Sequence, residues 1–422
     1  MHSVTNAIPT GTIASIPAKA HAHRALICAA LANSPSTILL SRTSKDIDAT
    51  MESLRGLGAH VVYENKVVTV TPGPVPAKGN VVPHESGTTL RLLLPVAASI
   101  CNDVDVDAKG RLPDRPLEPM LGEMKAHGVT FSQDKPPFTM TGRLQGGQFS
   151  MVGDVSSQFF SGLLLAAPQI GLSTITATTP LQSSDYVTLT TETMRDFGVE
   201  VEHTLPDTNI NEAFIVPFGA SFIGRDNYQI EGDWSNAAIW MVAAGMTGKP
   251  ITITGMNKNS VQADRRIMQV MIDAGCDVVW DGMNVTVTGR ASKPIHVDLE
   301  QMPDMLPVMA ALACSISGES SFIKGARLRL KESDRLIAVA NLVRDLGGTV
   351  REEGDDLYII GSGILKGGHG DCVNDHRLVM AGTLMALISK NPVTLKDSEA
   401  ITKSYPDFFE DWNLLGGDAH GI

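Results

Sequence analysis

The chain has 422 residues, of which 43% are hydrophobic and 19% are charged, and its 34 basic and 46 acidic residues give a net charge of −12. This length exceeds one ordinary hydrophobic core, so we expect two domains of a soluble globular protein. An acidic chain without a basic block is a poor partner for nucleic acid. Small anionic ligands stay compatible with it, because a few converging arginines can oppose the global charge.

The cysteines are odd in number and widely scattered, and none forms a C-x-x-C pair or a Cys/His cluster with metal-ligand spacing. They are Cys28, Cys101, Cys276, Cys314 and Cys372. The sequence therefore predicts a reducing compartment and no metal or cofactor. The apolar run 25–32 is crowded by His23 and Arg24, and no stretch approaches the roughly 18 apolar residues of a membrane span. We expect a cytoplasmic monomer without a membrane partner.

In chain order, the first elements are a helix over 20–33, a strand over 36–40 and a helix over 44–57 that Ser44 caps. A hairpin over 60–72 follows, with Asn65 near its turn. Further helices are predicted to begin at Thr88, Leu117, Gln158, Tyr186 and Asp233.

Glycines recur about 70 residues apart, each closing an apolar helical stretch, at Gly58, Gly128, Gly198, Gly275, Gly347 and Gly416. Glycine tolerates the left-handed backbone that ends a helix, so each copy predicts a helix, a stop and a strand. A helix-and-hairpin unit used six times follows from this repeat. The tail after Gly416 is too short for a hairpin. We therefore expect the segment from Met1 to about Ser15 to supply strands to the C-terminal half, with the chain crossing between domains near 18 and 231.

Polar motifs stand at several predicted helix starts, where free backbone N–H groups and the helix dipole favour anions. Lys19 and Arg24 are predicted to face one anion, or else to form a solvated basic turn. Gly87, in the run 85–91, allows a ligand to approach the backbone, and a plain Ser/Thr cap is the alternative. In the run 111–116 only Arg115 suggests function. The run 153–159 holds more hydrogen-bonding side chains than capping explains.

The most specific motif is 327–336, in which Lys331 and Arg335 are four residues apart and predicted to share a helix face beside Glu332. A surface ladder of ion pairs is the alternative. The apolar flanks favour partial burial, and a buried carboxylate among cations is suited to proton transfer. A last motif, 374–377, opens a long apolar helix, and Lys403 follows it.

These motifs, taken in order, resemble the 5-enolpyruvylshikimate-3-phosphate (EPSP) synthase family over essentially the whole chain. The resemblance rests on 86–91, 115–116, 156–158, 331–335 and 374–377. It implies an α/β (α+β) fold, an inside-out α/β barrel of two domains with three βαβαββ units each. It also implies a discontinuous domain over 1–18 and 232–422, a continuous domain over 19–231, and an active site in the cleft between them.

The resemblance further implies transfer of the enolpyruvyl group of phosphoenolpyruvate to the 5-hydroxyl of shikimate 3-phosphate, with release of phosphate, in the shikimate pathway to chorismate and aromatic amino acids. The implied ligands of phosphoenolpyruvate are Lys19, Gly87, Arg115, Gln158, Arg335, Arg377 and Lys403. The implied ligands of shikimate 3-phosphate are Lys19, Ala20, Arg24, Ser156, Ser157, Gln158, Ser183, Tyr186, Asp304, Arg327 and Lys331.

Three residues carry the chemistry in this resemblance: Lys19, Asp304 as the base for the attacking hydroxyl, and Glu332 as the acid that protonates the methylene carbon. An intermediate with a carboxylate and a phosphate needs a preorganised cationic shell, which the motifs supply. From the residues alone, Asp304 is interpreted as the N-cap of a helix over 305–314, and only the resemblance gives it a catalytic role.

Two departures from the family pattern stand out. The chain has Ala18-Lys19-Ala20 where the family usually has Ser-Lys-Ser, and the second serine normally binds shikimate 3-phosphate. Glu85 and Arg327 stand where many members have asparagine. The loss of the serine hydroxyl predicts weaker binding of shikimate 3-phosphate.

Two rival functions remain. UDP-N-acetylglucosamine enolpyruvyl transferase shares the fold, but it usually carries a reactive cysteine in the loop that corresponds to 108–116, and this chain has none there. A non-catalytic relative that binds anions is the other rival, and Ala18 and Ala20 are its only support.

Overall fold

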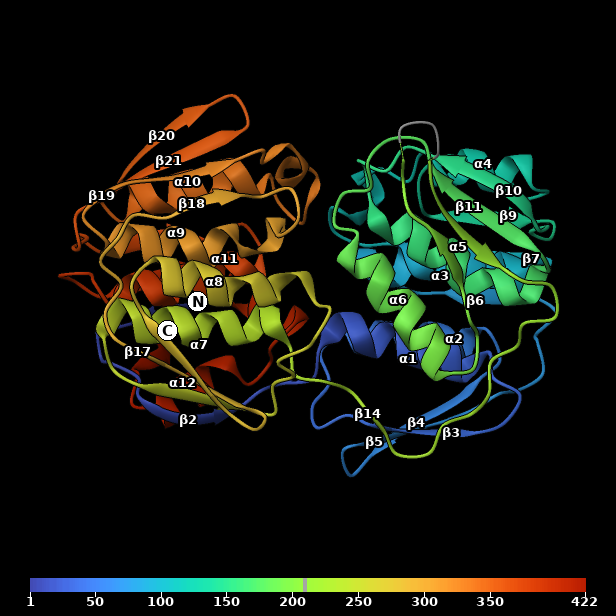
Figure 1. Ribbon diagram of the computed structural model, residues 1–422, viewed down its shortest axis with the longest axis horizontal. Helices are drawn as coiled ribbons and strands as arrows, with labels where there is room; N and C mark the ends of the chain where they lie inside the picture. Colours follow the sequence, from blue (N-terminus) through green and yellow to red (C-terminus); the bar gives the residue numbers. More distant parts are fainter. Residues whose placement is uncertain (208–210) are drawn as a thin grey trace. The chain divides into compact units, whose positions relative to one another are not determined.

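The computed structural model describes residues 1–207 and 211–422 and divides into two compact units. The discontinuous unit comprises Met1–Ile16 and Glu231–Ile422, and the continuous unit comprises Pro17–Ile230. Each unit has its own buried apolar core. The elements of both are labelled in Figure 1.

Each unit contains three four-stranded sheets in the described part of the chain. In the continuous unit the sheets are β14(Tyr228–Gln229)-β3(Ser36–Leu39)-β5(Val67–Thr71)-β4(His60–Glu64), β6(Gly79–Val81)-β7(Asp103–Val106)-β9(Phe138–Thr141)-β8(Thr130–Phe131) and β10(Gly147–Met151)-β11(Ser173–Ala177)-β13(Glu212–Val216)-β12(Glu202–Thr204). Its helices are α1 (Lys19–Ala30), α2 (Lys45–Gly56), α3 (Gly87–Ile100), the 3-10 helix η1 (Leu112–Asp114), α4 (Met120–Ala126), α5 (Ser157–Ile170) and α6 (Asp185–Asp196).

The discontinuous unit repeats this plan. Its sheets are β2(Gly11–Ala14)-β15(Ile251–Thr254)-β17(Asn284–Thr288)-β16(Asp277–Asp281), β18(His296–Asp298)-β19(Gly318–Ile323)-β21(Asp356–Gly361)-β20(Thr349–Glu353) and β22(Gly368–Asp371)-β23(Val393–Lys396)-β1(His2–Val4)-β24(Ala419–Gly421). Its α-helices are α7 (Trp234–Thr247), α8 (Ile267–Asp273), α9 (Leu306–Ser315), α10 (Arg335–Asp345), α11 (His376–Ala386) and α12 (Phe408–Leu414). Its 3-10 helices are η2 (Ala263–Arg266), η3 (Pro303–Met305), η4 (Ala326–Leu330) and η5 (Ser398–Lys403).

All six sheets share one pattern: the first two strands are parallel, and the third and fourth are antiparallel to their neighbours. The sheet that begins with β6 shows it, since β6 and β7 are parallel while β9 is antiparallel to both β7 and β8. In every sheet an odd-numbered helix precedes the second strand and an even-numbered helix follows it. In four sheets the odd-numbered helix also joins the first strand to the second, whereas β2 and β14 pair with strands far away in the chain. The expected βαβαββ unit, used six times, is confirmed.

The repeated glycines end the even-numbered helices, as predicted. Each lies two residues beyond its helix and has a φ between 87° at Gly347 and 105° at Gly58. In this left-handed region a Cβ atom costs energy, which explains why the sequence returns to glycine there.

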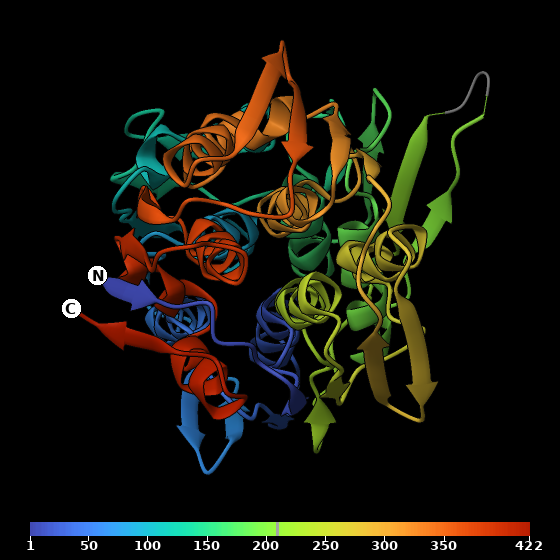
Figure 2. The same ribbon diagram turned by 90° about the vertical axis from the view of Figure 1, so that its left-hand side faces the viewer.

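The N-terminal segment supplies strands to the discontinuous unit, which confirms the prediction from the short tail. β1 pairs antiparallel with both β23 and β24, and β2 pairs parallel with β15. Figure 2 shows the two terminal strands side by side. A second pairing between distant segments occurs in the continuous unit, where β14 pairs parallel with β3.

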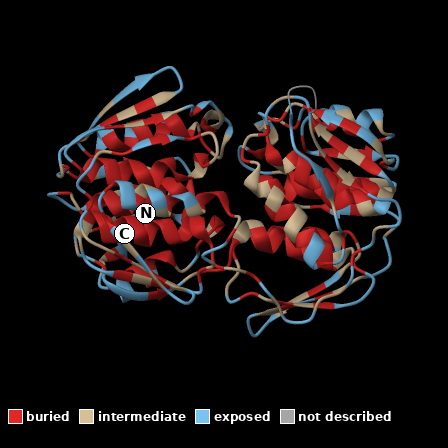
Figure 3. Ribbon diagram, viewed as in Figure 1, coloured by how far each residue is buried: buried red, intermediate tan, exposed pale blue. Residues whose placement is uncertain are grey.

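The odd-numbered helices form the interior of their units. In α9 every residue from Leu306 to Ser315 is buried, so this helix has no polar face, and α7 is buried over Trp234–Met246. Figure 3 shows such helices as continuous red stretches beneath strands with exposed residues. Because these helices are enclosed along their length, their N-terminal ends are where polar side chains gather.

Two predicted elements differ from the structure. The helix expected from Leu117 begins at Met120, after two prolines in the preceding turn. No helix spans Lys331 to Arg335: η4 ends at Leu330, and α10 begins at Arg335 with Asp334 as its cap. A serine and two aspartate or glutamate residues in 331–334 favour capping and turns over helix there.

Candidate active site

Candidate residues stand at the N-terminal ends of the odd-numbered helices in both units. Lys19, Gly87 and Ser157 are the first residues of α1, α3 and α5. In the discontinuous unit Arg377 is the second residue of α11, and Asp304 lies in η3 directly before α9. The free N–H groups and the dipole of each helix make these ends suited to anions.

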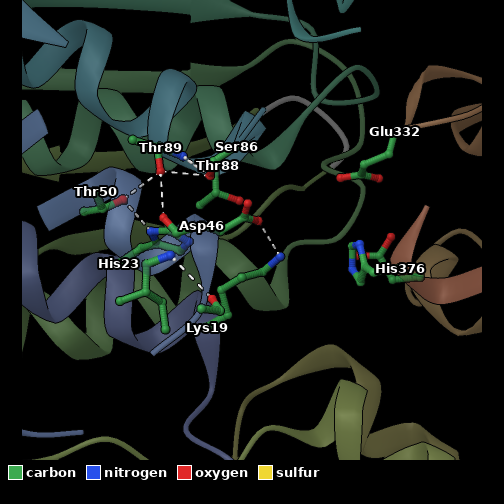
Figure 4. A network of polar contacts seen from close by, with 12 residues as sticks. Lys19, His23, Asp46, Thr50, Ser86, Thr88, Thr89, Glu332 and His376 are labelled. Atoms are coloured by element: carbon green, nitrogen blue, oxygen red, sulfur yellow. Dashed lines mark hydrogen bonds and ion pairs between the residues drawn. The ribbon is translucent and has the colours of Figure 1, made fainter. Parts of the chain in front are cut away.

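Lys19 is held by a carboxylate that the sequence did not single out. Its Nζ lies 2.8 Å from Oδ2 of Asp46, in the first turn of α2, and both side chains are mostly buried. Figure 4 shows this pair beside the N-terminal end of α3. Asp46 could have been noticed only as an acidic residue in a helix first turn, which is a common feature.

Arg24 is buried inside the continuous unit. Its guanidinium is 1% exposed and donates to Thr190 Oγ1 at 2.7 Å, to Ser161 Oγ at 3.2 Å and to the carbonyl oxygens of Ala20 and Tyr186. These bonds join α1, α5 and α6. Because Arg24 is buried, the alternative of a solvated basic turn is wrong.

Gly87 lies directly against Arg115. A Cβ atom at Gly87 would stand 2.5 Å from Nη1 of Arg115, so a side chain at position 87 would displace this guanidinium. Ser86 caps α3 by accepting the N–H of Thr89, which confirms the plain capping role. Capping by Ser86 is compatible with the close contact between Gly87 and Arg115.

Gln158 joins the same cluster from α5. Its Nε2 donates to Thr88 Oγ1 at 2.9 Å, and its Oε1 accepts from Arg91 Nη1 at 3.1 Å. Arg91 also donates to the carbonyl oxygen of Pro116 at 3.0 Å, next to Arg115. Arg91 thus fixes the loop that carries Arg115, a role for which the sequence offered no separate signal.

The remaining candidates of the continuous unit lie on α1, α5 and α6. Ser156 caps α5, Ser183 is buried with a φ of 54° and Tyr186 is half-buried in the first turn of α6. Ala20 is half-buried in the first turn of α1.

In the discontinuous unit, Arg335 donates hydrogen bonds to both candidate acid–base residues. Its Nη1 donates to Asp304 Oδ1 at 2.7 Å, and its Nη2 donates to Glu332 Oε2 at 2.6 Å. Lys331 adds a second cation, with Nζ 3.1 Å from Asp304 Oδ1. Both carboxylates are 23% exposed, whereas the Arg335 side chain is 1% exposed.

The charges around Asp304 keep it ionised. Burial would raise the pKa of its carboxyl, but the neighbouring cations outweigh burial and hold that pKa well below its usual range; they are Lys331, Arg335 and Arg377. Burial in turn lowers the pKa of Lys331.

Two expectations about this cluster were wrong in detail. Lys331 and Arg335 converge on Asp304, but through the bend between η4 and α10 and not along one helix face. Asp304 does not cap a helix over 305–314, since Met305 is the N-cap of α9 and no side chain caps it. The carboxylate of Asp304 is engaged by cations instead, and the alternative of a surface ladder is wrong because Arg335 is buried.

Asp375 is the residue that the sequence reasoning missed. It is fully buried, and both its oxygens accept from Arg335, at 2.9 Å from Nε and 3.2 Å from Nη2. It also accepts from Ser333 Oγ and from the N–H of Arg377, so it caps α11. Its place beside Asn374 and His376 in a candidate motif was the only signal.

Arg377 is buried and has an Nη1 without a hydrogen-bond partner among the described residues. Although burial lowers the pKa of this guanidinium, Asp304 and Asp264 more than compensate and raise it. A buried donor without an acceptor is costly, so an anionic ligand would satisfy it. Lys403, in η5, donates to the carbonyl oxygen of Asn374 at 2.7 Å, and Arg327 is half-buried on η4.

Three further features concern metal binding, membrane spans and the cysteines. Over residues 1–207 and 211–422, no three His, Cys, Asp or Glu side chains form a group that would hold a metal ion. No helix in this part of the chain is long and apolar enough to cross a membrane. All five cysteines are free and buried.

Comparisons with known proteins agree with this geometry. The family model described as EPSP synthase (3-phosphoshikimate 1-carboxyvinyltransferase) matches residues 7–412. The chain is 36% identical over 413 residues to the 3-phosphoshikimate 1-carboxyvinyltransferase of Clostridium kluyveri, with 97% of this chain and 95% of that protein covered. It is 34% identical over 417 residues to the enzyme of the same name from Methanocorpusculum labreanum, with 97% of each covered.

A solved structure shows the same fold. The structure of EPSP synthase from Acinetobacter baumannii aligns with a TM-score of 0.80 at 23% identity, covering 100% of this chain and 99% of that one. The α/β fold of repeated βαβαββ units expected from the sequence is therefore confirmed.

Proposed function

Because the chain belongs to the EPSP synthase family, we propose that it transfers the enolpyruvyl group of phosphoenolpyruvate to the 5-hydroxyl of shikimate 3-phosphate and releases phosphate. The observation that carries this proposal is the arrangement around Arg335, which holds one candidate base and one candidate acid through adjacent guanidinium nitrogens. Acid–base transfer of an enolpyruvyl group needs this combination of a proton acceptor, a proton donor and fixed positive charge.

We assign the substrates to the clusters as the family resemblance implies. Phosphoenolpyruvate is bound by Lys19, Gly87, Arg115, Gln158, Arg335, Arg377 and Lys403. Shikimate 3-phosphate is bound by Lys19, Arg24, Ser156, Ser157, Gln158, Ser183, Tyr186, Asp304, Arg327 and Lys331. The unpartnered Nη1 of Arg377 and the glycine beside Arg115 support the first set. The proposal requires residues of both units to act on the same pair of substrates.

Asp304 is the proposed base and Glu332 the proposed acid. A carboxylate with so low a pKa is ionised but is a weak base in the free protein. Anionic substrates that engage Lys331 and Arg377 compete with Asp304 for positive charge, which raises its basicity once they are bound. Glu332 then delivers its proton to the methylene carbon and takes it back when the tetrahedral intermediate breaks down.

The test is phosphate release from phosphoenolpyruvate with each acceptor offered separately. We expect release with shikimate 3-phosphate and none with UDP-N-acetylglucosamine, and Asp304→Asn and Glu332→Gln each to lower kcat by about a hundredfold or more. Release with UDP-N-acetylglucosamine alone would assign the rival transferase, and release with neither acceptor would assign a binding protein.

We further propose a cytoplasmic monomer. Five buried free thiols suit a reducing compartment. A net charge of −12 opposes self-association through like-charge repulsion. Light scattering on the purified protein measures the oligomeric state directly.

A further inference from the structure

A chain of buried polar groups joins the start of α1 to the start of α3 inside the continuous unit. His23 Nδ1 lies 2.7 Å from Thr50 Oγ1, and Thr50 Oγ1 lies 2.7 Å from Thr89 Oγ1. Thr89 Oγ1 lies 2.8 Å from Ser86 Oγ and 3.3 Å from the carbonyl oxygen of Asp46. Figure 4 shows these side chains close to Lys19 and Asp46.

The chain of hydrogen bonds has one direction that satisfies more of its members. With the proton of His23 on Nδ1, the ring donates to Thr50, Thr50 donates to Thr89, and Thr89 donates to Ser86 Oγ or the Asp46 carbonyl. In the opposite tautomer, Nδ1 accepts from the Thr50 hydroxyl and Thr50 accepts from the Thr89 hydroxyl. The Thr89 hydroxyl then no longer donates to the Asp46 carbonyl oxygen. It also places an N–H on Nε2, which is buried and has no partner in the described structure. We therefore assign the Nδ1–H form, in which Nε2 is only an unmet acceptor.

The Thr89 end of this chain contacts two residues that hold groups of the proposed reaction, Asp46 and Ser86. Asp46 holds the ammonium of Lys19 at 2.8 Å. Ser86 caps α3, and the next residue, Gly87, is the one pressed against Arg115. A shift of Thr89 would therefore move the helix end beside Gly87 and, through the Asp46 backbone, the carboxylate that orients Lys19.

The members of this chain are enclosed, which makes their geometry unusually well fixed. His23, Thr50 and Thr89 are 0% exposed, so none of them exchanges its bonds with water. The His23 ring stays neutral, since burial and then the charges of Lys19 and Arg24 hold its pKa well below the usual range. A neutral ring close to Lys19 keeps a polar partner for Thr50 in place without repelling the ammonium.

We propose that His23 and Thr50 are positioning residues: through Thr89 they hold the Lys19–Asp46 pair and the N-terminal end of α3 in one fixed arrangement for phosphoenolpyruvate. Neither residue touches a substrate in this scheme. The inference rests on the proposed function, because that function assigns Lys19 and Gly87 to the substrate.

The first experiment measures the arrangement without reference to activity. Thr50→Val keeps the shape of the side chain but removes its hydroxyl, and Thr50→Ser keeps the hydroxyl. Thr193→Val is the matched control, because Thr193 is a buried threonine of the same unit that donates only to its own helix, at Leu189. By amide hydrogen exchange, Thr50→Val should speed exchange at Thr89 and Leu90 by about threefold or more, whereas Thr50→Ser and Thr193→Val should match the wild type there. Equal exchange in the two valine variants would overturn the proposal.

The second experiment is kinetic, with shikimate 3-phosphate as acceptor. Thr50→Val should lower kcat/KM for phosphoenolpyruvate about three- to tenfold and change the KM for shikimate 3-phosphate less, and Thr50→Ser should restore it. If Thr50→Val does not fold, His23→Leu removes the first hydrogen bond of the chain instead. The same fall in kcat/KM for phosphoenolpyruvate is expected for it. A wild-type protein without activity would reject the proposed function while the exchange experiment still decides the positioning role. An active wild type with unchanged Thr50→Val kinetics would reject the positioning role alone.

Discussion

Asp375 accepts hydrogen bonds from Arg335 with both carboxylate oxygens, at 2.9 Å from Nε and 3.2 Å from Nη2, and both side chains are buried. A buried charge is tolerated only when it is paired, so each residue depends on the other. The remaining donors of Arg335 engage Asp304 and Glu332. Asp375 therefore determines where the proposed base and acid stand.

Replacing Asp375 by Asn should lower activity, although Asp375 is not among the proposed ligands of either substrate. The amide still caps α11 with its oxygen, but it loses the charge that orients Arg335, and its NH₂ group faces a guanidinium. We expect kcat to fall roughly tenfold or more, since hydrogen bonds to charged groups contribute about 1.5–3 kcal/mol. Steady-state assays with both substrates measure this. Asp345→Asn, at the exposed end of α10, the helix that begins with Arg335, is the control, and an equal effect in both variants would contradict the role of Asp375.

Gly87→Ala should weaken phosphoenolpyruvate specifically. The added Cβ would stand 2.5 Å from Arg115 Nη1 and 2.9 Å from its Cζ, so the guanidinium must move. A displaced guanidinium orients phosphoenolpyruvate less well. We therefore expect KM for phosphoenolpyruvate to rise roughly tenfold, with little change in KM for shikimate 3-phosphate. Gly421→Ala, where an added Cβ meets no other atom, controls for the substitution itself. Parallel changes in both KM values would show that Gly87 serves packing alone.

Ala20→Ser should strengthen the binding of shikimate 3-phosphate. Ala20 lies in the first turn of α1, next to Lys19, and a serine there adds a donor to a phosphate group. A bond to a charged group contributes about 1.5–3 kcal/mol, so KM for shikimate 3-phosphate should fall at least about tenfold. Ala30→Ser, at the other end of the same helix, is the control. An unchanged KM in Ala20→Ser would refute this interpretation of the Ala18-Lys19-Ala20 loop.

The sequence predicted the repeat because its signal is local. A helix stop needs a left-handed residue, so Gly58 and its counterparts mark the even-numbered helices without knowledge of tertiary structure. Helix starts such as Ser44, Ser86 and Asp233 are likewise set by their own side chains, which accept nearby backbone N–H groups.

What escaped prediction depends on contacts between distant segments. Asp46 meets Lys19 across 27 residues, and Asp375 meets Arg335 across 40. Either aspartate would be an ordinary acidic residue near a helix start if its partner were elsewhere. The Lys331 error has the same origin, since its spacing from Arg335 fits a helix, whereas Lys331 lies in the bend before α10 and both cations contact Asp304 from there.

Buried neutral histidines should make this protein less stable in mild acid. His21 is almost fully buried, with Nε2 2.8 Å from Tyr228 Oη, and burial followed by the charge of Arg24 lowers its pKa to about 4. In the unfolded chain the same group titrates near about 6.5. Between these values the unfolded state binds more protons than the folded state, so the free energy of unfolding falls as pH falls through this window. Below about pH 4 the group protonates in both states and adds no further slope.

His21→Gln tests this linkage, because glutamine keeps an N–H donor for Tyr228 but cannot titrate. We expect the free energy of unfolding of the variant, relative to the wild type, to gain up to about 3 kcal/mol between pH 6.5 and pH 4, which is the free-energy equivalent of the pKa shift. Urea titrations at pH values from about 4.5 to about 7.5 measure the slope. His60→Gln, at an exposed position on β4, should keep the wild-type slope. If His21→Gln also keeps it, the acid sensitivity belongs to other groups. The fully buried His23 is then the first to replace, since its ring too must gain a proton on unfolding in acid.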